Sequence, residues 1–353
     1  MYLILAINPG STSTKIALYE NENELFKESI GHPHGDMEKF AGLLDQIPMR
    51  LALVLDALEI HGYKPRDLSC VMGRGGMFPP MKTGGYKVNR RMLDMILNEE
   101  IPSHASNLGA VLASKVAELA GVDSYIYDGV SANEFPPVAK ITGMKEVERK
   151  SFCHVLNSRA VGMKYAQSLG KRYEDMNLIV AHLGGGITMG AHQRGSIVES
   201  LSDDNGPFAP ERAGSVPLLD VIKLCYSGLY TESEMIKKVR GMGGLRDLLG
   251  TSDGREIGKM VNAGDKYAKL VMEAQAYQIA KGIALVSPPL MGDIDAIILT
   301  GGLAHDRVVI ENVRKYVSHM ASDFVVMPGE LEMEALALGG LRILRGEEKT
   351  HEF

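Results

Sequence analysis

The chain opens with an apolar run that is broken by a polar turn and then resumes. The run YLILAIN, residues 2–8, is followed by PGSTST and then by KIALYE. Two such runs around a short turn rich in glycine and hydroxyl residues are typical of a β-hairpin. A similar pattern recurs half a chain later, where NLIVAH, LGGG, ITMGAHQ and GSIVES predict two or three strands. The recurrence indicates an internal duplication.

Helical periodicity fills much of the remaining sequence. In SNLGAVLASKVAELAG apolar side chains recur at helical spacing, at Leu108, Val111, Leu112, Val116 and Leu119. Gly121 is suited to end that helix. A longer helical segment, residues 266–286, is apolar on more than one face and is expected to be largely buried. Short apolar runs beside the helices predict further strands, so we expect an α/β fold with mixed sheets.

Length and charge narrow the class of protein. The 353 residues exceed one ordinary core, which predicts two domains. Apolar residues make up 45% and charged residues 23% of the sequence, as in globular proteins. The net charge is -6 with both signs interspersed, so the sequence offers no basic face for nucleic acid. An anionic substrate must then be held by locally placed Arg, Lys, His and backbone N–H groups.

Cysteine usage and hydropathy point to a cytoplasmic protein. The three cysteines, Cys70, Cys153 and Cys225, are far apart and form no C-x-x-C pair, so we expect neither a disulfide framework nor a zinc knuckle. The first apolar run lacks a basic flank and breaks at Asn8-Pro9, which argues against a signal peptide. No apolar stretch approaches the roughly 20 residues that span a bilayer, so no membrane association is expected.

The segment NPGSTSTK, residues 8–15, is the first candidate for phosphate binding. It lacks the second glycine and the G-K-[ST] order of a Walker A loop. Gly10 nevertheless allows close backbone approach, the hydroxyls at positions 11–14 are donors, and Lys15 adds charge. An ordinary polar turn with a solvated lysine explains the composition equally well. The presence of the second hairpin in the same chain favours the phosphate interpretation.

Three other segments are candidates for nucleotide contact. HLGGGITMG, residues 182–190, places three glycines between predicted strands, which suits a polyphosphate cradle as well as a flexible hairpin tip. LTGGLAHD, residues 299–306, ends a strand in glycines before a predicted helix, where a nucleotide can lie against the backbone or the chain can simply turn. TSDGRE, residues 251–256, is by itself typical of a solvated turn.

Several individual side chains could take part in chemistry. Asp128 follows the short strand SYIYD, from which it could present a carboxylate to magnesium. Two arginines, Arg74 and Arg212, are flanked by glycine-bearing turns. Two histidines, His104 and His154, lie in predicted loops, and two acidic residues, Glu332 and Glu334, lie near the C-terminal helix. A lone histidine is more often structural than catalytic, and the two glutamates also suit an exposed helix start.

Taken together, these segments resemble the acetate and butyrate kinase family, within the larger group of sugar kinase, Hsp70 and actin ATPase folds. The matching motifs occur in the family's order, as NPGSTSTK, GRGG, IPSHASNLGA, YDGV, SFCHVLNS, AHLGGG, GPFAPERAG, TSDGRE and LTGGLAHD. HASNLGA, GPFAPERAG, AYQIAK and LTGGLAH are most similar to the butyrate kinase branch. The resemblance implies ATP-dependent, reversible phosphorylation of a short-chain carboxylate such as butyrate or isobutyrate, with acetate or propionate kinase and, less closely, a sugar kinase as alternatives.

The resemblance also implies an architecture. It comprises two duplicated RNase H-like domains of the actin and Hsp70 type, each with a mixed five-stranded sheet, and an interdomain cleft. We expect residues 1–152 with 333–353 to form the N-terminal, acyl-substrate lobe and residues 153–332 the nucleotide lobe. A homo-oligomer, a dimer or higher, is expected, with a carboxylic acid and ATP as the small-molecule partners.

Roles carry over to matching positions. The cofactors implied are ATP/ADP and Mg²⁺. The nucleotide-binding positions are Asn8, Ser11, Ser13, Lys15, His182, Gly184, Gly185, Gly186, Asp253, Arg255, Gly301 and Gly302. The catalytic positions are Arg212, His154, His104, Asp128 and Arg74, and the metal positions are Asn8, Asp128 and Glu332.

The sequence departs from the acetate kinase pattern at substrate positions. The family's arginine before its V-V-H-G-G stretch is replaced by Val71, and the histidine of that stretch by Arg74, so Arg74 is the candidate replacement for the missing arginine. Gly73, Ser103 and Cys153 stand where acetate kinases carry bulkier residues. Smaller walls predict room for a longer or branched acid, with a discrimination of about 1–3 kcal/mol per methylene.

Overall fold

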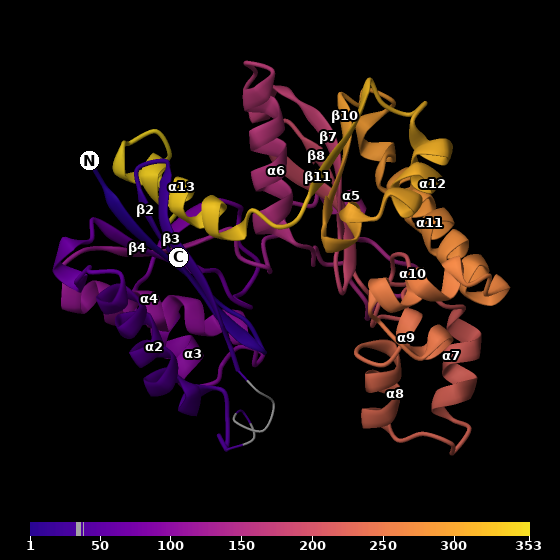
Figure 1. Cartoon of the computed structure of the whole chain (residues 1–353), viewed down its shortest axis with the longest axis horizontal. Helices are drawn as coiled ribbons and strands as arrows, with labels where there is room; N and C mark the ends of the chain where they lie inside the picture. The colour runs from indigo at the N-terminus through magenta and orange to yellow at the C-terminus, as the bar shows by residue number, and fades with distance from the viewer. Residues whose placement is uncertain (33–36, 38) are drawn as a thin grey trace. The chain divides into compact units, whose positions relative to one another are not determined.

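The computed structural model describes residues 1–32, 37 and 39–353, and the chain forms two compact units. Unit 1 comprises Met1–Asn133 and Leu331–Phe353, and unit 2 comprises Glu134–Glu330. Figure 1 shows the return of the chain, with the yellow C-terminal helix beside the indigo strands of unit 1. The sequence placed these divisions after residues 152 and 332.

Unit 1 is built on a six-stranded mixed sheet in the order β3-β2-β1-β4-β6-β5. Its strands are β1 (Leu3–Pro9), β2 (Ser13–Glu20), β3 (Asn23–Gly31), β4 (Cys70–Arg74), β5 (Gly85–Lys87) and β6 (Ser124–Tyr127). The first three are antiparallel neighbours, whereas β1, β4 and β6 run parallel. The three-residue β5 is an edge strand beyond the five strands expected.

Helices cover both faces of this sheet. They are α2 (Ile47–Ile60), α3 (Arg90–Leu97), α4 (Leu108–Ala120) and α13 (Glu332–Leu344), with short 3₁₀ turns that include η3 (Ala105–Asn107). Side chains alternate along β1, so Leu5 and Ile7 enter a core with α2 and α4. Ile4 points to the other face, where Gly340 of α13 approaches it closely. In Figure 1, α13 and α4 lie on opposite sides of the strands.

Unit 2 repeats the plan with a five-stranded sheet in the order β11-β10-β7-β8-β9. Its strands are β7 (Asn177–Leu183), β8 (Ile187–Gln193), β9 (Ser196–Leu201), β10 (Ala296–Gly301) and β11 (Asp323–Pro328). Its α-helices are α5 (Pro137–Lys140), α6 (Val155–Ser168), α7 (Leu218–Cys225), α8 (Glu232–Val239), α9 (Leu245–Leu249), α10 (Gly254–Asn262), α11 (Lys266–Val286) and α12 (Arg307–Val317), and η6 (Gly302–His305) follows β10. The predicted long helix is confirmed as α11. The expectation that it is largely buried was wrong, because Leu270, Tyr277 and Leu285 on its outer face are exposed.

The duplication predicted from the sequence is confirmed by the strand pairing. In each unit a hairpin of three antiparallel strands continues through its first strand into two parallel strands, as β3-β2-β1-β4-β6 and β9-β8-β7-β10-β11. The first strands also carry equivalent helices, because α13 packs on β1 and α6 packs on β7. The α/β fold with two mixed sheets is therefore confirmed. Within the described residues, no helix is long and apolar enough to cross a membrane.

Candidate active site

In unit 1 the predicted site residues gather at one edge of the sheet. Asn8 lies near the end of β1, Arg74 ends β4, and Asp128 follows β6. These three strands are parallel neighbours, so their carboxyl ends meet at the same edge. That edge is where ligands bind in open α/β sheets.

Glu332 joins this edge from the far end of the sequence. It is the first residue of α13, and its Oε2 accepts a hydrogen bond of 2.6 Å from Nδ2 of Asn8. Arg74 lies 3.2 Å from the carboxylate and also donates to Oδ1 of Asn8 at 3.3 Å. Lys15 is the strand partner of Asn8 across the hairpin, and its Nζ lies 3.9 Å from Oε2 of Glu332. Two cations and the positive end of a helix dipole thus surround one buried carboxylate.

Asp128 is held by a hydrogen bond from a distant part of the chain, and His104 by a local one. Asp128 is buried and has a left-handed backbone with φ of 46°, and its Oδ1 accepts from the backbone N–H of Gly84 at 2.7 Å. His104 is exposed and caps η3, where its Nδ1 lies 2.6 Å from the hydroxyl of Ser106. The structure thus fixes both side chains near the segments that follow β6 and precede α4.

The first predicted phosphate loop carries Ser11 and Ser13. Ser11 is exposed, and the loop is closed by a backbone hydrogen bond of 2.8 Å from Gly10 N to Ser13 O. The loop rests on Arg50 of α2, a residue that the sequence reasoning missed. The side chain of Arg50 donates to Gly10 O at 2.9 Å, to Ser13 O at 3.3 Å and to Oγ1 of Thr14 at 2.9 Å.

Arg50 is fully buried, and all five of its N–H donors are used, two of them by Oε1 of Gln46. Burial lowers the pKa of its guanidinium, which remains a cation because arginine does not deprotonate in proteins. Its acceptors within the described part of the chain are all neutral. A signal was present in the sequence, because an arginine stands among the apolar residues of IPMRLALVLD.

In unit 2 two predicted histidines stack on each other. The rings of His154 and His182 lie 3.8 Å apart at an angle of 11°. His154 caps α6 and its Nδ1 is 2.8 Å from Oγ1 of Thr188, the strand partner of His182. His182 is buried, and its Nδ1 lies 2.9 Å from Nδ2 of Asn157. Asn157, which sequence reasoning did not single out although it lies in SFCHVLNS, also donates to Thr300 at 3.3 Å.

The glycine loop after β7 lies beside the segment that carries Arg212. An ideal Cβ added at Gly184 would lie 2.8 Å from Nε2 of His182, so a side chain there would meet the ring. A Cβ at Gly186 would lie 3.9 Å from Oδ2 of Asp203, and the same oxygen accepts from Nε of Arg212 at 3.0 Å. The structure therefore brings His154, His182, the glycines and Arg212 into one region of unit 2.

The predicted adenosine motif forms a tight corner after β10. Gly301 has φ of 89°, and an added Cβ would meet the carbonyl oxygen of Leu183 at 2.5 Å. Gly302 is exposed, and an added Cβ would have open space around it. The corner is thus compatible with a flat ligand lying on backbone.

Asp253 and Arg255 are exposed at the start of α10. Asp253 caps the helix by accepting from Arg255 N at 2.7 Å. Their recorded hydrogen bonds are local ones, so a contact with the Gly301 corner stays a prediction.

One expectation about the acyl pocket was wrong. A Cβ added to Gly73 would overlap the backbone of Gly109 in α4, so this glycine allows a close helix–strand contact and lines no open wall. Cys153 is buried, and burial raises the pKa of its thiol to about 12. Its place in the acyl pocket stays a prediction.

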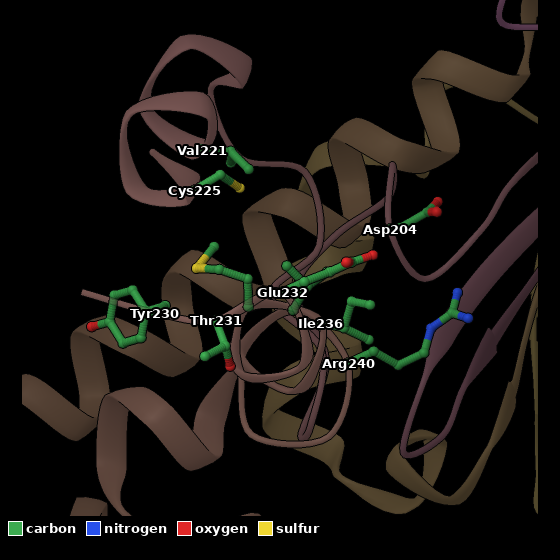
Figure 2. Close-up of a pocket in the computed structure, with 10 residues that line it drawn as sticks. Asp204, Val221, Cys225, Tyr230, Thr231, Glu232, Ile236 and Arg240 are labelled. Atoms are coloured by element: carbon green, nitrogen blue, oxygen red, sulfur yellow. The ribbon is translucent and has the colours of Figure 1, made fainter. Parts of the chain in front are cut away.

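A cavity of about 460 Å³ lies elsewhere in unit 2, between α7 and α8 (Figure 2). Most of its lining is apolar, with Asp204 and Arg240 at one end and Tyr230 at the other. None of the predicted site residues belongs to its lining as described.

The oxygen donors of unit 1 suit magnesium only as a partial ligand set. Within the described residues no group of three or more His, Cys, Asp or Glu side chains forms a metal cage. Asn8, Asp128 and Glu332 are oxygen donors of the hard type that Mg²⁺ prefers. Because Mg²⁺ usually keeps waters and phosphate oxygens and takes one or two protein carboxylates, this donor set fits a metal that arrives with a nucleotide.

Comparison with known proteins adds a family and a fold. A model of the acetokinase family matches residues 138–327, more than half of the chain. The structure is similar to that of Porphyromonas gingivalis acetate kinase, with a TM-score of 0.79 and 18% identity over 98% of this chain and 100% of that one.

Two further solved structures are similar. Entamoeba histolytica acetate kinase gives a TM-score of 0.75 at 14% identity over 96% of this chain and 98% of that one. A propionate kinase from Francisella tularensis gives a TM-score of 0.72 at 16% identity over 96% of this chain and 99% of that one. At these identities the likeness concerns the fold.

Proposed function

The chain belongs to the acetokinase family, and from that premise we propose that it transfers the γ-phosphoryl group of ATP to the carboxylate of a short-chain acid. The products are an acyl phosphate and ADP. The observation that carries the proposal is the set of charges at the carboxyl edge of unit 1. There Lys15 and Arg74 face the buried carboxylate of Glu332 beside a loop rich in hydroxyl groups.

The acceptor in this reaction needs no general base. A carboxylic acid similar to a glutamate side chain has a pKa of about 4.3 and is already ionised at neutral pH. The chemical difficulty is repulsion between this anion and the phosphates of ATP. Cations must offset the repulsion and stabilise the charge that spreads over the transferred phosphoryl group.

The two units supply different parts of that task. In unit 1, Asn8, Asp128 and Glu332 would hold magnesium, which neutralises phosphate charge when it is bound, while Lys15 and Arg74 add positive charge. In unit 2, Arg212 would stabilise the phosphoryl group.

The remaining predicted groups would bind and orient. His154 and His182 would donate hydrogen bonds, and the glycine loop would offer backbone N–H groups to the phosphates. Asp253, Arg255 and the Gly301 corner would contact the adenosine.

The length of the acid is the finer part of the proposal. Motifs such as HASNLGA and GPFAPERAG are most similar to butyrate kinases, which favours butyrate or isobutyrate. The similar solved structures carry the names of acetate and propionate kinases, which favours the shorter acids. Gly73 gives no argument for a larger pocket, because it lies against a helix backbone, whereas the small side chain of Cys153 would favour a longer acid if it lines the pocket.

A hydroxamate assay with purified protein, ATP and Mg²⁺ tests both parts. Acids of two to five carbons, straight and branched, are compared with glycerol as a hydroxyl acceptor in a coupled ADP assay. Acid-dependent hydroxamate formation that is greatest for four carbons supports the proposal, and a maximum at two or three carbons selects acetate or propionate.

Arg212→Ala should lower the rate by about 10³-fold or more. Turnover with glycerol alone, or near wild-type turnover of Arg212→Ala, contradicts the proposed chemistry or the role of Arg212.

A further inference from the structure

The carboxylate of Asp203 binds two arginine side chains at once. Nε of Arg212 donates to Oδ2 at 3.0 Å, and Nη2 of Arg240 donates to Oδ1 at 2.5 Å. The side chain of Asp203 is 10% exposed. The side chains of Arg212 and Arg240 are 25% and 44% exposed, so the carboxylate is shielded from water more than its partners are. Two guanidinium groups against one carboxylate leave one net positive charge.

The backbone around Arg212 is fixed independently of Asp203. Ala213 N donates to Val239 O at 2.9 Å, and Gly241 N donates to Glu211 O at 2.8 Å. Gly244 has φ of 69°, and a side chain there would overlap the carbonyl oxygen of Ala209. The segment around Arg212 is therefore held against the end of α8 and the residues that follow it, and the direction of the guanidinium depends on its side-chain partners.

Those partners occupy one part of the guanidinium. Asp203 takes Nε, and the backbone carbonyl of Glu211 takes Nη1 at 3.0 Å. Within the described residues Nη2 of Arg212 has no acceptor, and the side chain is 25% exposed. Both N–H groups of Nη2 and the second N–H of Nη1 can therefore donate to a bound anion.

Arg240 determines how the carboxylate can meet Arg212. An arginine and a carboxylate readily form two parallel hydrogen bonds. If Asp203 did so through Nε and Nη2 of Arg212, one of the two N–H groups of Nη2 would be withdrawn from a ligand. Arg240 binds Oδ1, and Arg212 is bound through Oδ2. The guanidinium carbon of Arg240 lies 5.7 Å from the centre of the Phe152 ring. Arg240 also lines the cavity between α7 and α8 (Figure 2).

We propose that Asp203 is a positioning residue for Arg212, and that Arg240 keeps Asp203 bound to Arg212 through a single oxygen. The inference rests on the proposed function, in which Arg212 stabilises the transferred phosphoryl group. Asp203 touches no substrate and acts through the direction of the guanidinium. Its place beside Gly186 directs Arg212 toward the glycine loop.

The first test compares Asp203→Asn with Asp204→Asn in the full chain. Both remove one negative charge, but Asp204 is exposed and accepts a hydrogen bond from Ser202, away from Arg212. Misplacing a reacting group by about 1 Å can cost about 100-fold, so Asp203→Asn should lower kcat roughly 10- to 100-fold with KM little changed. Asp203→Glu should recover part of the loss, and Asp204→Asn should behave as wild type.

The second test uses Arg240→Met and the double variant. Loss of Arg240 frees Oδ1 to bind Nη2 of Arg212, so kcat should fall although Arg212 and Asp203 are both present. In the Asp203→Asn background the same substitution should add little, because the carboxylate that would bind Nη2 is gone. Additive losses in the double variant would overturn the proposed role of Arg240.

A spectroscopic measurement separates this inference from the proposed function. The Nε–H resonance of Arg212, assigned with Arg212→Lys, should exchange slowly with water in the wild-type protein and rapidly in Asp203→Asn, with circular dichroism confirming the fold. If the Nε–H of Arg212 exchanges as slowly in Asp203→Asn as in the wild-type protein, or if Asp203→Asn leaves the kcat of an active enzyme unchanged, the inference is overturned. A wild-type protein without acid-dependent turnover refutes the proposed function, whereas the resonance still tests the contact.

Discussion

The two units place functional side chains at equivalent positions and fill them with different chemistry. In unit 1, Asn8 near the end of β1 has Lys15 as its partner across the hairpin. Arg74 stands beside it at the end of β4, and Glu332 reaches it from the start of α13. This set consists of three charged groups and one amide.

In unit 2 the same positions carry imidazole and hydroxyl groups. His182 near the end of β7 pairs with Thr188 across the hairpin and with Thr300 on the parallel strand β10. His154 at the start of α6 stacks on the His182 ring. The two units thus share the geometry of a strand end and a helix start, whereas the side chains placed there differ.

The loops before these positions are also supported in different ways. The first loop rests on the buried cation Arg50, which contacts Gly10, Ser13 and Thr14. Both loops are closed by a backbone hydrogen bond, from Gly10 N to Ser13 O at 2.8 Å and from Gly184 N to Gly186 O at 3.2 Å. The first loop adds to this closure the buried arginine beneath it.

The largest predicted effect follows from removal of Arg50. Arg50→Met leaves Gly10 O without its donor and removes one partner each from Ser13 O, which keeps Gly10 N, and from Thr14 Oγ1, which keeps His32. An unpaired buried acceptor costs about 1–3 kcal/mol and each further lost hydrogen bond about 1 kcal/mol, so the free energy of unfolding should fall by about 3 kcal/mol or more. Arg50→Lys keeps a charge but lacks the planar guanidinium group. Its free energy of unfolding should therefore lie between those of the wild-type protein and Arg50→Met. Urea unfolding measures the change.

Arg90→Met on α3 is the matched control for Arg50→Met, because the side chain of Arg90 is 87% exposed. Equal stability of the two methionine variants would contradict the role of Arg50.

The charged set of unit 1 predicts the next effect. Glu332→Gln keeps the shape that meets Asn8 but removes the carboxylate between Lys15 and Arg74. If the carboxylate helps to hold magnesium, the Mg²⁺ concentration for half-maximal activity should rise about 10- to 100-fold. Glu334→Gln, two residues further along the same helix, controls for the loss of charge. An unchanged Mg²⁺ requirement in Glu332→Gln would remove this residue from the metal site.

Local patterns were enough to predict most of the fold. The hairpins, the helix that ends at Gly121 and the long helix α11 follow from periodicity and turn residues within short windows. The charged edge of unit 1 was harder, because it joins Asn8 to Glu332 across 324 positions, and only the resemblance to a family brought the two residues together.

The missed residues depend on tertiary packing. A sequence does not show that Arg50 is buried under a loop 40 residues away, or that Asp203 is shared by two arginines. Gly73 was misinterpreted for the same reason, since its close neighbour Gly109 lies on a helix that a local pattern does not place.

The glycine corner of unit 2 gives a sharper comparison within one motif. Gly301→Ala forces a side chain onto a backbone with φ of 89° and against Leu183 O, which should cost about 1–3 kcal/mol in unfolding free energy. Gly302→Ala meets open space, so it should leave stability unchanged while weakening nucleotide affinity if the adenosine lies there. Thermal unfolding and ATP titration measure the two effects. A stable Gly301→Ala protein would show that the corner can relax.

The last effect is a slope spread over several pH units and concerns a buried base in unit 2 that stays neutral, in contrast to the buried cation of unit 1. Burial lowers the pKa of His192 to about 3, with a further contribution from the positive charge of Arg159. Its Nδ1 lies 2.6 Å from the hydroxyl of Tyr173, and its Nε2 has no hydrogen-bond partner among the described residues. A proton added to this ring would therefore be poorly stabilised.

The sign of the pH dependence follows from the lowered pKa of His192. Above the ordinary histidine pKa of about 6.5 both the folded and the unfolded chains are neutral at this position, so it contributes no slope. Between pH 6.5 and the folded pKa of about 3 the unfolded chain binds a proton that the folded chain does not, so stability falls with falling pH by at most about 1.4 kcal/mol per pH unit. His192→Gln should remove this part of the slope in urea unfolding between pH 4 and 7. His319→Gln replaces an exposed histidine of the same unit as the control. An unchanged slope in His192→Gln would mean that the ring takes up its proton in the folded protein after all.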